Sequence, residues 1–180
     1  HTYRLFRSAQ IFGMKIPFAK EEIEEAQKEV VRRNKLGSCY IRPIAFYGSN
    51  ALGVAAKTKP VLVAIAAWPW GAYLGADGIE KGIRVKTSSY THHHPNVTMC
   101  KAKAVGNYPV SILANQEATH DGYEEAMLLD PQGFLCQGSG ENVFIVRNGA
   151  LHTPDLAGGA LEGITRETII EFARELGIPV

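Results

Sequence analysis

The sequence predicts an α+β fold of two domains, and three observations lead to this class. Segments rich in β-branched and aromatic residues occur in both halves of the 180-residue chain. Helical patterns lie between some of them but do not alternate regularly, as a doubly wound parallel sheet would require. A glycine-rich stretch at 71–80, GAYLGADGIE, separates the halves. We therefore expect part of a small N-terminal α/β domain at 1–70, an interdomain connection at 71–80 and part of a larger domain at 81–180.

The first half is predicted to contain one helix and two strands. Residues 20–34, KEEIEEAQKEVVRRN, carry apolar residues at helical spacing, with acids early and bases late as the helix dipole prefers. SCYIRPIAFY at 38–47 and the apolar run at 60–68 have the composition of strands.

The second half is predicted to be richer in strands. A helix is expected over 107–120 with Pro109 in its first turn, and a final helix with Thr165 as N-cap and Gly177 as stop. The expected strands are IRVKTSSY at 83–90, EAMLLD at 125–130, FLCQ at 134–137, NVFIVRNG at 142–149 and LHTP at 151–154.

The composition of the chain indicates which kinds of binding partner are not expected. The chain is 46% hydrophobic and 21% charged, with a formal net charge of +1 and no basic stripe, so we expect neither nucleic acid nor a membrane as partner. Three cysteines without metal-ligand spacing favour reduced thiols and a cytoplasmic protein. Adjacent histidines in THHHPN, 91–96, would point to opposite faces of a strand, so no metal site is expected. The chain starts without methionine and stops just after a helix, so we expect an interior segment of a longer protein.

Two lysines, Lys101 and Lys103, lie in the otherwise apolar or small segment MCKAKAVGNY, 99–108. A buried unpaired ammonium is costly, so such a lysine snorkels to water, pairs with an acid or loses its proton. From the residues alone, two solvated lysines are the favoured interpretation, and a neutral reactive amine is the alternative.

Three further motifs each have a functional and a structural interpretation. QGSGEN at 137–142 either lets the backbone approach a ligand or forms an ordinary turn. LEGITRE at 161–167 either holds a phosphate at a helix start or is a simple helix cap. Arg42 in YIRP either recognises a carboxylate or serves a structural ion pair, and the residues leave this open.

Taken together, these motifs have a specific resemblance. KAVGNY, QGSGEN, LEGITRE and YIRP, with WPWGAYLG at 68–75 and RLFRSA at 4–9, occur in an order and spacing that resembles the branched-chain amino acid aminotransferases. These are pyridoxal phosphate enzymes of fold type IV. The resemblance covers essentially the whole chain, which corresponds to the interior of the family's sequence.

The resemblance implies a site for pyridoxal 5'-phosphate. Lys103, and not Lys101, matches the family's Schiff-base lysine, whose amine must be neutral and which we expect to be buried beside a cationic site. The other implied cofactor residues are Tyr108 for the phenolic oxygen, Arg4 with Ile164 and Thr165 for the phosphate, Leu161 against the ring and Gln137 at the pyridine nitrogen.

The resemblance also implies the substrates, namely branched-chain L-amino acids and 2-oxo acids including 2-oxoglutarate. It gives Tyr40 and Arg42 to a substrate carboxylate, Trp70 and Tyr73 to the pocket wall, and Leu52, Gly53 and Val54 to a loop that closes over the ligand. Relatives of this kind form dimers or larger homo-oligomers.

Two residues depart from the family pattern. Glu162 replaces a proline of some relatives at a loop position, and we expect the change to be tolerated. Gln137 replaces a glutamate whose carboxylate keeps the pyridine nitrogen protonated, and a neutral amide cannot form that ion pair. The alternatives are a weakly active or non-catalytic relative that binds the cofactor, and a D-amino acid transaminase or aminodeoxychorismate lyase of the same fold. The GEN of QGSGEN and the YIRP segment argue against the last two.

Overall fold

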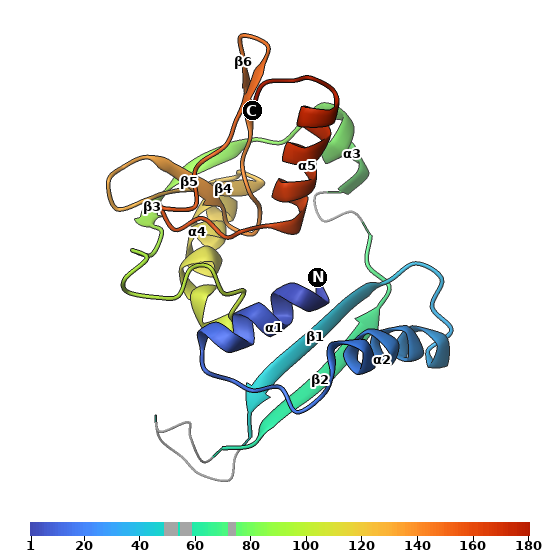
Figure 1. The fold of residues 1–180 in the computed structure, drawn as a ribbon. Coiled ribbons are helices and arrows are strands. Elements are labelled where there is room, and N and C mark those ends of the chain that lie inside the picture. The colour runs from blue at the N-terminus through green and yellow to red at the C-terminus, as the bar shows by residue number, and fades with distance from the viewer. Residues whose placement is uncertain (49–53, 55–58, 72–74) are drawn as a thin grey trace. The chain divides into compact units, whose positions relative to one another are not determined.

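The computed structural model describes residues 1–48, 54, 59–71 and 75–180, which form two compact units, His1–Gly75 and Ala76–Val180 (Figure 1). The division falls within the glycine-rich stretch 71–80. That stretch is more than a connection, because Gly75–Lys81 forms helix α3. The sequence does not predict α3, since its two glycines lower helix propensity.

Two helices belong to the first unit. Helix α2 (Lys20–Arg33) confirms the predicted helix, and the carboxylate of Glu22 accepts the backbone N–H of Ala19 at 2.7 Å. Helix α1 (Thr2–Ile11) is not predicted, because no side chain caps its start and no acid lies in its first turn. The amide Nε2 of Gln27 donates to Thr2 Oγ1 at 3.1 Å and links the two helices.

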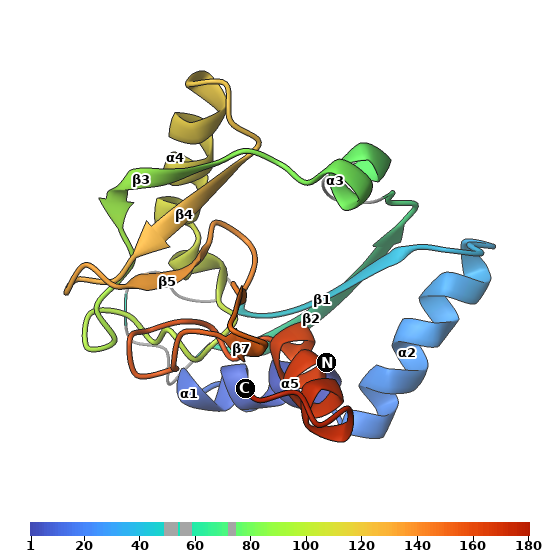
Figure 2. The ribbon, with the colours of Figure 1, turned by 90° about the horizontal axis from the view of Figure 1, so that it is seen from above.

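Strands β1 (Tyr40–Tyr47) and β2 (Val61–Trp68) confirm the two predicted strands and pair antiparallel, with Tyr40 opposite Trp68 and Tyr47 opposite Val61. Helices α1 and α2 lie on one side of this pair (Figure 2). The hydroxyl of Tyr47 donates to the backbone carbonyl of Phe12 at 3.1 Å. This hydrogen bond holds the end of α1 against β1.

The second unit contains a three-stranded sheet in the order β3-β4-β5. Strand β3 (Val85–Thr91) runs parallel to β4 (Glu125–Leu129), and β5 (Leu135–Gly138) pairs antiparallel with β4. All three predicted strands are confirmed, with ends that differ from the predicted ones by two residues at most.

Helix α4 (Pro109–His120) crosses between the parallel strands β3 and β4 and packs on both (Figure 2). Its residues Ala114 and Ala118 are fully buried against Ala126 and Leu128 of β4. Pro109 lies in the first turn as predicted, while Asn107, the expected first residue of the helix, ends a separate turn, η2 (Val105–Asn107), and Tyr108 is the N-cap of α4. Small residues at the contact therefore let the helix lie close to the sheet.

Strands β6 (Ile145–Arg147) and β7 (Ala150–His152) form a hairpin shorter than the predicted strands. Its two-residue loop, Asn148 and Gly149, has φ of 52° and 76°, as a type I′ turn requires.

Helix α5 (Ile164–Glu175) closes the unit, and Gly177, with φ of 68°, follows its end as predicted. Its N-cap is Gly163, so the prediction that Thr165 caps it is wrong. In the ranges described, no helix has the length and apolar character needed to cross a bilayer.

Candidate active site

The segment from His92 to Tyr108 joins β3 to α4 and is tied to the sheet and to itself. The backbone N–H of His92 donates to Leu129 O at 2.8 Å, at the end of β4. The side-chain amide of Asn107 donates to Met99 O and Ala102 O, at 3.1 Å each. An irregular segment rather than a strand therefore presents the two lysines of this motif.

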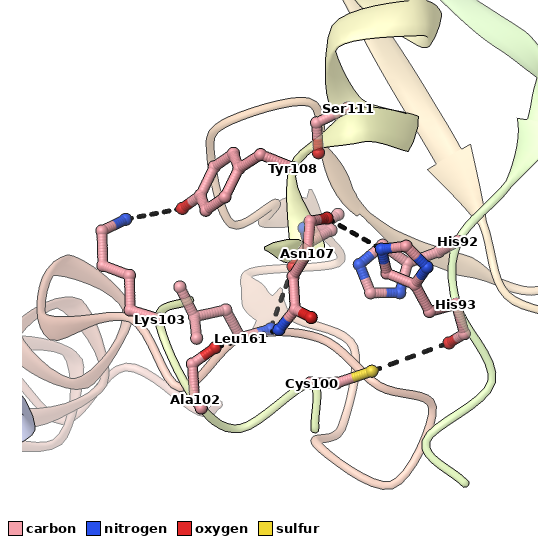
Figure 3. Close-up of a pocket in the computed structure, with 10 residues that line it drawn as sticks. His92, His93, Cys100, Ala102, Lys103, Asn107, Tyr108, Ser111 and Leu161 are labelled. Carbon is pink, nitrogen blue, oxygen red and sulfur yellow. Dashed lines mark hydrogen bonds between the residues drawn. The ribbon is translucent and has the colours of Figure 1, made fainter. Parts of the chain in front are cut away.

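This segment, β5 and the residue Leu161 surround a cavity of about 30 Å³ (Figure 3). Four predicted cofactor residues lie on its wall: Lys103, Tyr108, Gln137 and Leu161. The remaining lining residues are His92, His93, Cys100, Ala102, Asn107 and Ser111. The structure thus brings together four predicted residues that are up to 58 positions apart, from Lys103 to Leu161.

Lys103 and Tyr108 make a direct polar contact on the cavity wall. The ammonium of Lys103 donates to the Tyr108 hydroxyl at 2.7 Å and lies 5.3 Å from the centre of the ring (Figure 3). Lys101 is exposed and does not line the cavity. The geometry therefore distinguishes the two lysines in the way that the family pattern does.

The expectation that Lys103 is buried is wrong for this chain. Its side chain is exposed, because it leaves an irregular segment rather than a strand covered by sheet neighbours.

Gln137 lies on β5 and contacts the loop before α5. Its side-chain carbonyl Oε1 accepts the backbone N–H of Leu161 at 2.9 Å. A backbone N–H can only donate, so this contact fixes which end of the amide faces Leu161. The Nε2 end has no hydrogen-bond partner among the described residues and is not sealed from solvent.

The remainder of QGSGEN holds the same loop. The amide of Asn142 donates to Leu161 O at 2.8 Å. Glu141 accepts the backbone N–H of Gly140 at 3.1 Å, and burial, followed by its hydrogen bond with Glu125, raises the pKa of Glu141 to about 7. This carboxyl therefore keeps its proton to near neutral pH.

The start of α5 is built around a glycine. A Cβ added to Gly163 would lie 1.9 Å from Asn142 Oδ1, so any other residue here would force Asn142 to move. The first helical hydrogen bond runs from Glu167 N–H to Gly163 O at 3.1 Å, and the N–H groups of Ile164 and Thr165 precede it. Such free donors at the positive end of a helix can receive an anion.

The predicted substrate residues belong to the first unit. The guanidinium carbon of exposed Arg42 lies 5.2 Å from the Tyr40 ring centre and 5.3 Å from that of Trp68. The Trp70 ring lies 4.8 Å from the Tyr40 ring. These contacts form a cation on an aromatic surface.

The remaining predicted residues are one phosphate residue, the closing loop and one residue of the pocket wall. Arg4 lies on α1 of the first unit, and Val54 is exposed. Leu52, Gly53 and Tyr73 lie outside the described residues.

Several cavity residues are not predicted from the sequence. His93 Nε2 lies 2.7 Å from Asn107 O, and the His92 and His93 rings are 5.2 Å apart. Burial lowers the pKa of His92. Asn107, four residues after Lys103 in KAVGNY, is a signal that could have been used, since a polar side chain amid small residues often organises a turn.

The cysteines behave as small packing residues. Cys100 and Cys136 are buried free thiols, and burial raises the pKa of Cys136 to about 12. Cys39 is half-buried just before β1. Within the ranges that the structure describes, no three His, Cys, Asp or Glu side chains gather as a metal site.

Proteins similar to this chain include branched-chain amino acid aminotransferases. A branched-chain-amino-acid aminotransferase of Pseudomonas aeruginosa is 51% identical over 177 residues, covering 98% of this chain and 57% of that protein. The crystal structure of the Escherichia coli branched-chain amino acid aminotransferase superposes with a TM-score of 0.97 at 45% identity, over 100% of this chain and 60% of that chain. The branched-chain amino acid aminotransferase of Thermobaculum terrenum, crystallised in its PLP form, gives a TM-score of 0.90 at 37% identity, over 100% and 58%.

The chain therefore spans less than two thirds of the length of these relatives. The sequence profile described as amino-transferase class IV matches residues 1–180. Since that match extends over every motif from RLFRSA to LEGITRE, the chain belongs to the class IV aminotransferases.

Proposed function

We propose that the protein exchanges amino groups between branched-chain L-amino acids (leucine, isoleucine and valine) and 2-oxoglutarate, with pyridoxal 5'-phosphate as cofactor. The carrying observation is the contact of Lys103 Nζ with the Tyr108 hydroxyl on the wall of one cavity. The relatives named as branched-chain aminotransferases support the choice of reaction. The relative crystallised in its PLP form supports the choice of cofactor.

The described residues fit this cofactor by their chemistry. A primary amine and a phenol lie 2.7 Å apart. The N–H groups that start α5 suit a phosphate, because no side chain caps this helix start with a hydrogen bond. When bound, pyridoxal phosphate supplies a carbonyl that takes up an amino group and a ring that accepts electrons from Cα.

The roles of the chain's own residues follow from their positions. Lys103 Nζ would hold the cofactor covalently and then, once displaced by the amino acid, carry the proton that leaves Cα. Tyr108 orients that nitrogen through the 2.7 Å contact. We assign Ile164 and Thr165 to the phosphate and Leu161 to the ring, and the family resemblance alone assigns Arg4 to the phosphate.

Substrate selection needs a surface that accepts either an aliphatic side chain or a second carboxylate. Arg42 over Tyr40 and Trp68 offers this combination, because a guanidinium on aromatic faces pairs with glutamate while the rings favour leucine or valine. We assign Trp70 and Tyr73 to the pocket wall, and Leu52, Gly53 and Val54 to the closing loop.

Gln137 favours a second candidate, a relative that binds the cofactor but transfers amino groups slowly. The amide end that faces away from Leu161 is a neutral N–H donor. Such a donor favours the unprotonated state of the cofactor's ring nitrogen. Removal of the substrate's Cα proton is faster when that nitrogen is protonated, so the reaction would be slow.

We further propose that the protein acts in the cytoplasm as a homo-oligomer. The free thiols of all three cysteines agree with a reducing compartment. The oligomer follows from the family resemblance.

The test uses the full-length protein with pyridoxal phosphate, leucine and 2-oxoglutarate. Formation of glutamate, with borohydride reduction labelling Lys103, would support the transaminase. A visible band that leucine does not change would favour the slow or non-catalytic relative. If D-alanine or aminodeoxychorismate reacts and leucine does not, the proposed substrate class is wrong.

A further inference from the structure

We propose that His93 is a positioning residue for the Lys103–Tyr108 pair, acting through the backbone carbonyl of Asn107. His93 Nε2 lies 2.7 Å from this carbonyl oxygen, on the same cavity as the pair (Figure 3). The inference rests on the proposed function for the role of Lys103. The contact itself is independent of that function.

The chemistry of the contact fixes the state of the imidazole. A carbonyl oxygen only accepts hydrogen bonds, so Nε2 must carry the hydrogen. A neutral His93 ring is thereby restricted to the tautomer with hydrogen on Nε2. The adjacent His92 ring, 5.2 Å away and at 64° to it, is buried with a lowered pKa and so is uncharged near neutral pH.

The carbonyl that His93 holds belongs to the peptide group between Asn107 and Tyr108. A rotation of this peptide group would turn the backbone of Tyr108, which caps α4 with φ of −92° and ψ of −10°. The next carbonyl along the chain, Tyr108 O, accepts the first hydrogen bond of helix α4, from Ile112 N–H at 2.9 Å. The imidazole therefore fixes a peptide group that lies just before the helical ladder.

Asn107 is also held by its side chain. Its Nδ2 donates to Met99 O and Ala102 O, and Ala102 directly precedes Lys103. Asn107 thus connects His93, two residues after the end of β3, to the backbone just before Lys103 and just before Tyr108. We infer that His93 determines where the Tyr108 hydroxyl lies relative to Lys103 Nζ.

The neighbouring His94 provides a matched control. It is exposed and does not line the cavity, and its Nδ1 accepts the backbone N–H of Asn96 at 3.1 Å. Replacing it disturbs the same loop without touching Asn107 O.

The first measurement examines the contact without cofactor. Histidine-ring ¹⁵N–¹H spectra of the cofactor-free full-length protein should show hydrogen on Nε2 of His93 across the pH range in which the protein is folded. A neutral His93 with hydrogen on Nδ1 only would overturn the proposal.

The second measurement compares His93→Leu, His93→Gln and His94→Ala in the holoenzyme. His93→Leu should lower kcat about tenfold, equal to about 1.4 kcal/mol, with KM unchanged. It should also shift the apparent pKa of the Lys103-linked cofactor, read from visible absorbance against pH. His93→Gln should restore both, because its amide N–H can reach the carbonyl, and His94→Ala should match the parent.

A His93→Leu variant that equals the parent, or a His93→Gln variant as impaired as His93→Leu, would reduce His93 to a space-filling role and overturn the proposal. Absence of a visible band in the parent would contradict the proposed function instead. The tautomer measurement would still report on the contact in that case.

Discussion

The side-chain carbonyl of Gln137 accepts a hydrogen bond from the backbone N–H of Leu161 at 2.9 Å. A glutamate at this position would accept the same bond with one oxygen and leave a second, charged oxygen at the other end. Glutamine leaves an NH₂ group there. Glutamine in place of glutamate therefore changes the outer end of the side chain from an acceptor to a donor. The contact with Leu161, which positions the side chain, is kept.

Gln137→Glu should speed the half-reaction with leucine by about one to two powers of ten, if a charge-assisted hydrogen bond contributes roughly 1.5–3 kcal/mol. Stopped-flow decay of the cofactor's visible absorbance would measure this rate. The ¹⁵N shift of ring-labelled cofactor should change from pyridine to pyridinium in the variant. An unchanged rate and an unchanged shift would show that another group controls the ring nitrogen.

Lys103→Ala should abolish transamination and the visible band of the bound cofactor, because no amine remains to hold it covalently. Lys101→Ala is the control, since Lys101 lies outside the cavity and should leave the band intact. Absorbance spectroscopy and peptide mass spectrometry after borohydride reduction would report the outcome. Labelling of Lys101 in the parent would refute the assignment.

Arg42→Ala should impair glutamate more than leucine, because only glutamate brings a second carboxylate. Loss of a charge-assisted bond should reduce kcat/KM for glutamate by about one to two powers of ten, or roughly 1.5–3 kcal/mol. Arg32→Ala is the control, since Arg32 pairs with Glu25 on the surface of α2 at 2.6 Å. Equal losses for the two substrates would argue against the role of Arg42.

Gly163→Ala should destabilise the protein by about 1–3 kcal/mol through overpacking, because the new Cβ meets the side chain of Asn142. Asn142 cannot move away without breaking its hydrogen bond to Leu161 O. Thermal unfolding would measure the loss. Gly37→Ala is a suitable control, since nothing lies within 4 Å of its Cβ position. In the Gly163→Ala background, Asn142→Ala should remove the clash, and a further loss of the same size would contradict this explanation.

Glu117 should contribute to acid sensitivity. The pKa of Glu117 is lowered to about 2 from its ordinary 4.5. The largest cause is the hydrogen bond from Ser88, followed by the hydrogen bond from Lys86. A depressed carboxyl pKa gives stability that is present above pH 4.5 and is lost as the pH falls towards 2. Urea unfolding of Glu117→Gln between these values should show a flatter pH dependence than the parent, and parallel curves would count against it.

The sequence predicted the long elements because their patterns are local. Helix α2 and strand β2 carry their own periodicity and composition, and both were found within one residue of the expected ends. The N-cap of α5 was wrong because local capping preference favoured Thr165. The actual cap depends on Asn142, which approaches from 21 residues upstream of Gly163.

The site was predicted unevenly for the same reason. Motif order led to Lys103, Tyr108, Gln137 and Leu161, which share a cavity. His93 could not be found in this way, because its partner is a backbone carbonyl 14 residues away and leaves no trace in composition. The exposure of Lys103 was missed because it depends on which elements cover the irregular segment.

The hydrogen bonds within the segment 92–108 have an entropic consequence. Asn107 ties this segment to itself, and His92 ties it to the residue that ends β4. Ordering a flexible segment costs conformational entropy, and a ligand that must impose that order binds more weakly. Here that cost is met during folding, so the cofactor proposed to react with Lys103 would encounter a preorganised wall.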